Sequence, residues 1–316
     1  MNHGIPIGLA AAVLQSTSYL VSAAFVRAHA DRRGAGAALV ARSFLAMGVV
    51  SAVALPAFCA ARPGLVAPLR TWFPAALGTI AANVVAQVAM AATLRAADAS
   101  RVSPLLGVKI LFLALLGIVL AGDRYGSLQW GGIALSLAAA ELLSRSGGRL
   151  GAAGALGVGA TAAFYALSDF GIRVQQDAFH AWALHLAERG IEPLPAIGAN
   201  MAILFGDYAL GGAVALAAMP FTGRYAALDW SRHILPYAAV WLGAMALLYV
   251  SFDLLGVVHG TIVQSTRGLL SIGLGWALAR WGGTALERRL PPGVLAGRVA
   301  AGILMFLAIV VFTLGG

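Results

Sequence analysis

Two basic side chains lie deep inside apolar stretches of the sequence, where a charge either binds a ligand or is neutralised by a partner. Lys109, the only lysine in the chain, is surrounded by SRVSPLLGVKILFLALLGIVLAG at residues 100–122, and Arg267 lies in a second apolar run. A charge at the centre of a membrane-spanning helix costs about 2.5–3.5 kcal/mol on insertion scales, so such residues are functional candidates. Arg42 is a third basic residue of this kind, but it lies nearer the start of its run and could extend to the membrane surface.

Lys109 and Arg267 together favour an anion as the ligand. An arginine binds a carboxylate or a phosphate through two parallel hydrogen bonds, and a lysine binds either group as a point charge. A cationic ligand would be repelled there unless an acidic residue dominated the local field. The alternative is that each cation is held in a buried ion pair, for which the sequence offers Asp253, Asp169, Asp207 and Glu141.

Polar residues recur at helical spacing in the same apolar runs. We expect them to line a solvated path, and the alternative is hydrogen bonding between packed helices, worth only about 0.6 kcal/mol each. Asp169 and Asp253 could also carry protons for coupling, although exchange without protons is equally open. The residues spaced three or four apart are Gln15 and Tyr19, Asn83 and Gln87, Tyr165 and Asp169, and Gln264, Arg267 and Ser271.

The sequence contains no combination of residues typical of an enzyme or of a metal site. Its one cysteine, Cys59, excludes an intrachain disulfide and a cysteine-based metal cluster. The phosphate-binding loop, the nucleophile elbow of hydrolases and the dinucleotide fingerprint are all missing from it. We therefore expect a protein that is not an enzyme and that carries neither a cofactor nor a metal ion.

The composition indicates an integral membrane protein. The chain is 60% hydrophobic and 10% charged, with a mean hydropathy of +0.87, whereas a soluble domain carries about 25% charged residues. Its apolar runs are long and continuous, unlike the alternating segments of about ten residues that form a membrane barrel. The formal net charge of +9 does not indicate nucleic acid, because the arginines are scattered in short connections and form no stripe with aromatic residues.

A spanning helix needs about 20 apolar residues, and the sequence provides a series of such stretches. We therefore expect an all-α polytopic membrane protein with about ten transmembrane helices. Most connections between them are too short to hold a further domain. The expected spans lie near 5–27, 37–60, 72–94, 102–121, 127–144, 150–173, 198–220, 233–255, 258–280 and 294–314.

An internal repeat divides the chain into two five-helix halves, residues 1–149 and 150–316. Because the number of helices in each half is odd, the second half enters the membrane in the opposite orientation, as in the inverted repeats of many secondary transporters. The match rests on rare residue types, which are Tyr19 with Tyr165, Arg27 with Arg173, Trp72 with Trp230, and Lys109 with Arg267.

The second half contains an additional segment at about residues 175–197. Phe179, Trp182 and Leu186 fall on one helical face, and charged residues occupy the rest of the helix surface. We therefore expect a short, separate amphipathic helix that rests at the membrane interface.

The end of the first half, ALRAADASRVSPLLGVKILFLALLGIVLAGDRYGSLQWGGIALSLAAAELL, resembles the EamA-like members of the drug/metabolite transporter superfamily. The resemblance rests on small residues and a serine before Pro104, an apolar helix, a short charged turn at Asp123–Arg124, and GGIAL. The family usually has a glutamate where Asp123 stands. The corresponding turn of the second half is longer and more basic, with Glu287 as its nearest acid.

The resemblance implies a central cavity lined by helices one to four and six to nine, and alternating access by rocking of the two halves. Sugar-phosphate translocators of this superfamily bind phosphate with basic residues on helices four and nine, and Lys109 and Arg267 are similar in position. Family members usually keep both termini in the cytoplasm. The excess of arginine in the odd-numbered connections instead places both termini outside.

We expect a secondary transporter that moves a small or amphiphilic organic anion, bearing carboxylate or phosphate, across the cell (inner) membrane. A flippase for an anionic lipid or lipid-linked sugar is one alternative, and an exporter of amino acids or drugs is another. The expected partners are an anionic metabolite or lipid headgroup and the lipid bilayer, without nucleic acid, and a homodimer is left open. Lys109 and Arg267 would bind the anionic group, and the residues shaping the cavity would be Tyr19, Tyr165, Asn83, Gln87 and Gln264.

Overall fold

The protein is helical throughout the part that the computed structural model describes, namely residues 3–29, 35–61, 66–96, 102, 105–145, 151–192, 195–222, 230–280 and 292–315. The long helices are α1 (Gly4–Ala28), α2 (Ala35–Ala61), α3 (Val66–Ala96), α6 (Ser127–Arg145), α7 (Ala152–Glu188), α8 (Ala196–Thr222), α9 (Leu235–Leu255) and α12 (Pro292–Leu314). The shorter elements are the 3-10 helix η2 (Leu106–Val108), α5 (Lys109–Leu116), the π-helices η3 (Gly117–Ala121) and η5 (Trp230–Ile234), α10 (Val257–Gln264) and α11 (Arg267–Arg280).

Six of the described helices are long and apolar enough to cross a membrane. Two shorter apolar helices, Leu106–Ala121 and Ala300–Leu314, accompany them. The prediction of an all-helical protein with several membrane spans is therefore confirmed. The six candidate spans are Gly4–Val26, Ala35–Ala57, Trp72–Leu94, Ala152–Glu188, Ala196–Pro220 and Arg232–Leu255.

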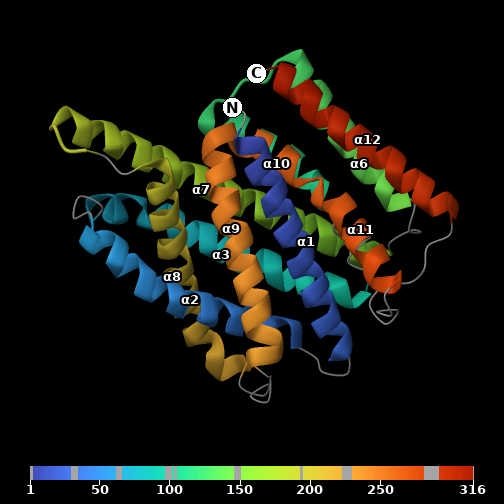
Figure 1. Ribbon diagram of the computed structural model, residues 1–316, viewed down its shortest axis with the longest axis horizontal. Helices are drawn as coiled ribbons and strands as arrows, with labels where there is room; N and C mark the ends of the chain where they lie inside the picture. Colours follow the sequence, from blue (N-terminus) through green and yellow to red (C-terminus); the bar gives the residue numbers. More distant parts are fainter. Residues whose placement is uncertain are drawn as a thin grey trace.

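Long helices from the two ends of the chain pack against each other in pairs (Figure 1). α1 runs antiparallel to α9, α3 to α7 and α6 to α12, and α2 crosses α8. Each pair combines one helix from residues 1–149 with one from residues 150–316. α2 and α8 touch through glycines, since a Cβ atom at Gly48 would collide with the backbone of Gly212. Small residues of this kind let membrane helices approach closely.

α7 is a single helix of 37 residues, where we expected a shorter span followed by a separate amphipathic helix at about 175–197. The helix continues because no glycine or proline interrupts it between Gly171 and Gly190. Gln175 and Gln176 are buried, and they donate hydrogen bonds to residues of α3 and α8 that hold this part against the bundle. At 1.5 Å per residue the helix is about 55 Å long, so it exceeds the roughly 30 Å hydrocarbon core of a bilayer.

The region expected as one helix over 258–280 is divided into two. Gly256, with φ of 79°, separates α9 from α10, in a backbone conformation that glycine adopts readily. Ser265 and Thr266 separate α10 from α11. Their hydroxyl groups donate to carbonyls three residues earlier, at 2.5 and 2.8 Å, and such local bonds compete with a regular helix. All eight residues of α10 are buried.

Candidate functional site

Lys109 and Arg267 have similar local positions in the helices that carry them. Each is the first residue of an α-helix that follows an irregular turn. The 3-10 turn η2 precedes Lys109, and the turn at Ser265 and Thr266 precedes Arg267. Both residues are only 2% exposed. The interruptions of the two helices therefore lie directly beside the two buried cations.

Lys109 forms an ion pair that connects the two halves. Its ammonium group donates to Asp169 Oδ2 on α7 at 2.5 Å and to Gln264 Oε1 on α10 at 2.9 Å. The buried ion pair was the alternative to ligand binding for this residue, and Asp169 is the partner among the four acids considered. Two of the three ammonium protons are thus used within the protein.

Arg267 is bound differently. Its Nη1 donates to Gln15 Oε1 at 2.9 Å, and its guanidinium lies 5.7 Å from the centre of the Tyr19 ring. Gln264 Nε2 donates to the same Gln15 oxygen at 2.7 Å. This one amide oxygen therefore accepts hydrogen bonds from both Arg267 and Gln264. Within the described part of the chain, Arg267 has no acidic partner at hydrogen-bond distance, and its Nε donates no hydrogen bond.

The two cations line one small enclosed cavity. Its volume is about 10 Å³, which is close to the space that one water molecule needs. Every residue of its wall is buried. The wall consists of Gln15, Tyr19, Asn83, Lys109, Tyr165, Asp169, Trp241, Met245, Leu248 and Arg267.

Several hydrogen-bond donors on this wall lack acceptors. The buried hydroxyl groups of Tyr19 and Tyr165 lie near each other, but neither forms a hydrogen bond of good geometry with the described residues, and Arg267 Nε also lacks an acceptor there. A buried polar group without a partner costs about 1–3 kcal/mol, so native proteins rarely keep several together without a purpose. Unpaired donors beside two cations are groups of the kind that hydrogen-bond to the oxygens of an anion.

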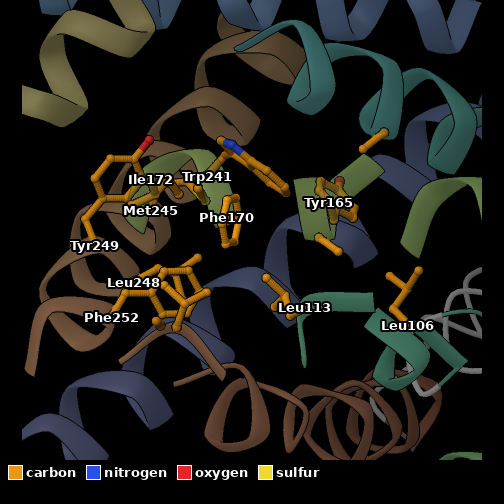
Figure 2. Close-up of a cluster of buried hydrophobic side chains, with 14 of the residues drawn as sticks. Leu106, Leu113, Tyr165, Phe170, Ile172, Trp241, Met245, Leu248, Tyr249 and Phe252 are labelled. Carbon is orange, nitrogen blue, oxygen red and sulfur yellow. The ribbon is translucent and has the colours of Figure 1, made fainter. Parts of the chain in front are cut away.

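Aromatic rings form another part of the cavity wall. The Trp241 ring lies 6.3 Å from Tyr165, 6.0 Å from Tyr237 and 6.2 Å from Tyr19, measured between ring centres. The indole N–H donates to Tyr208 Oη at 2.7 Å, which orients the ring. Figure 2 shows Trp241 and Tyr165 within the buried cluster, where the rings lie among apolar side chains.

The remaining predicted amides lie around this cavity. Asn83 reaches its wall, and Gln87, one turn further along α3, donates to Asn83 Oδ1 at 2.8 Å. Tyr237 in turn donates to Gln87 Oε1 at 2.9 Å. Gln87 and Gln264 are therefore one residue removed from the cavity, where they orient the side chains that form it. Arg42 is buried on α2 and is not part of the wall.

Asp253 lies apart from the other predicted residues, in an open pocket of about 370 Å³ that we name the vestibule. Its carboxylate contacts His180 Nε2 at 2.9 Å and accepts a hydrogen bond from Asn200 Nδ2, also at 2.9 Å. The vestibule lies at the end of the bundle near both chain termini (Figure 1). It is lined by Asp123, Tyr125, Gln129, Arg173, Gln176, Asp177, His180, Phe252, Asp253, Leu255, Gly256, Val257, Val258, His259 and Phe312.

A bidentate ion pair crosses the vestibule between the halves. Both terminal nitrogens of Arg173 on α7 donate to the carboxylate of Asp123, in the turn between η3 and α6. These bonds hold the pKa of Asp123 below its usual value. Burial raises the pKa of Tyr125, whose hydroxyl donates to the same carboxylate at 3.1 Å. The pair fixes the Asp123 turn against α7.

Trp241, Met245 and Leu248 are wall residues that sequence reasoning missed, and Trp241 is the one that carried a signal. The signal available was a tryptophan in the middle of an apolar run, four residues after Tyr237. Gln15 was recognised as polar and at helical spacing from Tyr19, but its role as the acceptor shared by Arg267 and Gln264 emerges only in the structure.

Comparison with known proteins gives limited information about this chain. No family model matches the chain. An "Uncharacterized transporter in cobO 3'region" of Sinorhizobium sp is 26% identical over 133 residues, which is 42% of this chain and 93% of the relative. A crystal structure matches 99% of this chain and 97% of its own, with a TM-score of 0.63 and 20% identity, and this likeness shows the fold alone.

The fold and the site together define the class of protein to which this chain belongs. The chain is a multi-pass helical membrane protein with a buried, charged cavity whose wall combines residues from 1–149 and from 150–316. The similarity to a relative named as a transporter agrees with this class.

Proposed function

We propose that the protein is a secondary transporter that moves a small organic anion across the cell (inner) membrane by alternating access. The observation that carries the proposal is the central cavity, where Lys109 and Arg267 meet and where Arg267 Nε, Tyr19 Oη and Tyr165 Oη have no acceptor among the described residues. Donors of this kind bind carboxylate or phosphate oxygens.

The charges of the cavity support an anion. Lys109 and Arg267 carry two positive charges, Asp169 carries one negative charge, and the wall otherwise consists of neutral groups. Asp169 is already bound to Lys109, so the charge without an ionic partner among the described residues is that of Arg267. In a low-dielectric cavity, binding of one negative charge is favoured over binding of a cation.

The helix pairing supports an arrangement of two inverted repeats with ten spans. Under the repeat, the α1–α9 pair corresponds to the α3–α7 pair, while α2–α8 and α6–α12 each correspond to themselves. All four pairs occur (Figure 1). The relative named as a transporter is less than half as long as this chain, as expected where one half is a unit. Such halves rock about a site near the membrane midplane.

The enclosure of the cavity separates this proposal from its main rival. A flippase must leave the lipid tails in the bilayer, so its site opens sideways. The central cavity here is surrounded by buried side chains, which favours a soluble substrate. An exporter of amino acids is a second candidate, because Asp169 lies beside the cations and could bind an ammonium group.

Transport assays in proteoliposomes test the proposal. Labelled benzoate, succinate, glycerol 3-phosphate and the cation tetraphenylphosphonium are offered under imposed gradients of pH and of substrate. We expect uptake of at least one anion and none of the cation. Arg267→Gln should reduce that uptake about tenfold or more, the effect of losing one charged hydrogen bond. The uptake by Arg267→Lys should lie between that of the native protein and that of Arg267→Gln, because lysine keeps the charge but lacks the planar guanidinium donors.

Arg42→Gln is the matched control, since Arg42 is also a buried arginine within a span but does not reach the cavity. It should retain uptake. Tyr165→Phe removes one unpartnered hydroxyl and should weaken the apparent affinity without unfolding the protein. Uptake of the cation, or equal uptake by the Arg267→Gln and native proteins, would contradict the proposal.

A further inference from the structure

We propose that the central cavity selects a planar aromatic monocarboxylate. This inference rests on the proposed function and names the substrate class of the same site. It combines three observations, which are the net charge of the wall, the aromatic ring of Tyr19 beside Arg267, and the presence of Trp241, Met245 and Leu248 on the same wall.

The charge of the site fits a monoanion better than a dianion. Lys109 is held by Asp169 at 2.5 Å and by Gln264 at 2.9 Å, so a ligand could recruit it only by breaking these contacts. Arg267 offers its free Nε without such a cost. A phosphate monoester carries about two charges near neutral pH and would leave one of them unbalanced in a buried site.

The same argument separates a carboxylic acid from an amino acid. An ammonium group would need Asp169, the one acid among the described residues of the wall, and Asp169 is occupied by Lys109. A zwitterion would therefore have to displace a buried ion pair, whereas a simple carboxylate would not. The wall thus favours a ligand with one negative charge and no positive charge.

The wall next to the charged groups is aromatic and apolar. Trp241, Tyr165 and Tyr19 bring their rings to it, and Met245 and Leu248 complete it. The only N–H of the Trp241 side chain is used by Tyr208, so Trp241 offers no free indole donor to the wall. A sugar has no π face, so it would gain no stacking contact with these rings. A flat ring instead gains contact with the aromatic faces.

The cavity can adapt to a ring of this size when the halves separate. At about 10 Å³ it does not hold an aromatic acid in the enclosed conformation. Met245 contributes an unbranched, flexible side chain, and its sulfur accepts only a long contact of 3.9 Å from Gln15. Methionine fills and vacates irregular space more easily than a branched residue does.

Binding measurements on the purified full chain in detergent test this inference. The probes are benzoate, cyclohexanecarboxylate, phenyl phosphate and L-phenylalanine, with affinity read from ligand-induced thermal stabilisation and checked by uptake into proteoliposomes. Benzoate should bind about threefold to tenfold more tightly than cyclohexanecarboxylate, the range that an aromatic pair contributes beyond its buried area. Phenyl phosphate and L-phenylalanine should bind more weakly than benzoate.

Trp241 variants separate a selective role from a structural one. Trp241→Leu should bring the ratio between benzoate and cyclohexanecarboxylate close to one, and Trp241→Phe should keep most of the preference. If Trp241→Leu does not fold, the ratio measured for the native protein still tests the aromatic preference, and a native ratio near one would overturn the inference. An unchanged preference in folded Trp241→Leu would overturn the inference.

Failure of the inference and failure of the proposed function give different results. Equal binding of benzoate and cyclohexanecarboxylate, both abolished by Arg267→Gln, would refute the aromatic preference and leave anion transport intact. Tight binding of L-phenylalanine would show that Asp169 accepts an ammonium group, and phenyl phosphate as the best ligand would show a site for a dianion, so either result would overturn the inference. Binding of no anion, or binding independent of Arg267, would refute the proposed function itself.

Discussion

Removing either partner of the Lys109–Asp169 ion pair should destabilise the protein strongly, whereas removing both should not. The two side chains are 3% and 4% exposed and lie 2.5 Å apart, so each charge depends on the other in the absence of water. Breaking a buried pair by removing one partner typically costs about 3–5 kcal/mol, because the remaining charge is left uncompensated.

Because of Arg267, the two single variants should lose different amounts of stability. It attracts Asp169 and repels Lys109 across the same cavity. Lys109→Met therefore leaves Asp169 with a nearby cation, and we expect a loss near 3 kcal/mol, the lower end of the range of about 3–5 kcal/mol. Asp169→Asn leaves two cations facing each other, and we expect a loss near the upper end, about 5 kcal/mol. The double variant keeps the net charge of the cavity and should lose less than about 2 kcal/mol.

Unfolding by sodium dodecyl sulfate in mixed micelles, followed by far-ultraviolet circular dichroism, measures these differences. The four proteins form a double-mutant cycle. The interaction free energy between Lys109 and Asp169 obtained from it should be several kcal/mol and stabilising. Losses in the double variant equal to the sum of the single losses would refute the reasoning. So would an Asp169→Asn protein as stable as the native one.

Three further changes test other contacts. Gly256→Ala should cost about 1–3 kcal/mol in a melting experiment because φ is 79° there, whereas Gly243→Ala, whose Cβ would make only an ordinary contact, should be close to neutral. Gly48→Ala should lower the melting temperature, because its methyl group would meet the backbone of α8. Asp123 has a pKa lowered by Arg173, so its stabilisation is complete above the unfolded pKa of about 3.9 and is lost as the pH falls through the folded value. The difference in melting temperature between native and Asp123→Asn proteins should therefore shrink below about pH 4, and a constant difference would contradict this.

The membrane class of the protein could be predicted because it depends on local composition. An apolar run of sufficient length has few alternatives to a helix in a bilayer, where each backbone group needs a partner within the segment. The six long apolar helices follow from this rule. The same rule does not say where such a helix ends. The spacing of Phe179, Trp182 and Leu186 fits a continuation of α7 as well as a separate helix.

The importance of Lys109 and Arg267 could also be predicted, since the cost of a buried charge is a property of the residue and its surroundings in sequence. The acidic partner of Lys109 could not be predicted from the sequence. Asp169, Asp207, Asp253 and Glu141 are all acids within or beside apolar runs, and only the packing of α5 on α7 selects Asp169.

The turn at Ser265 and Thr266 shows why local geometry is hard to predict in this chain. Both residues can continue a helix or bond back to the preceding turn. In the structure they bond back, and Arg267 begins a new helix, where its carbonyl group accepts a hydrogen bond from Ser16 at 3.0 Å. The choice depends on this contact with α1, far away in the sequence.

The uninterrupted course of α7 has a mechanical consequence. Gly171 contacts Thr79 of α3 closely, and it lies between Asp169, on the wall of the cavity, and Arg173, in the vestibule. Asp169 and Arg173 lie one helical turn apart on this rigid helix, each bound to a residue of the segment 105–126. A tilt of α7 that withdrew Asp169 from Lys109 would therefore also displace Arg173 from Asp123, so the two ion pairs are mechanically linked.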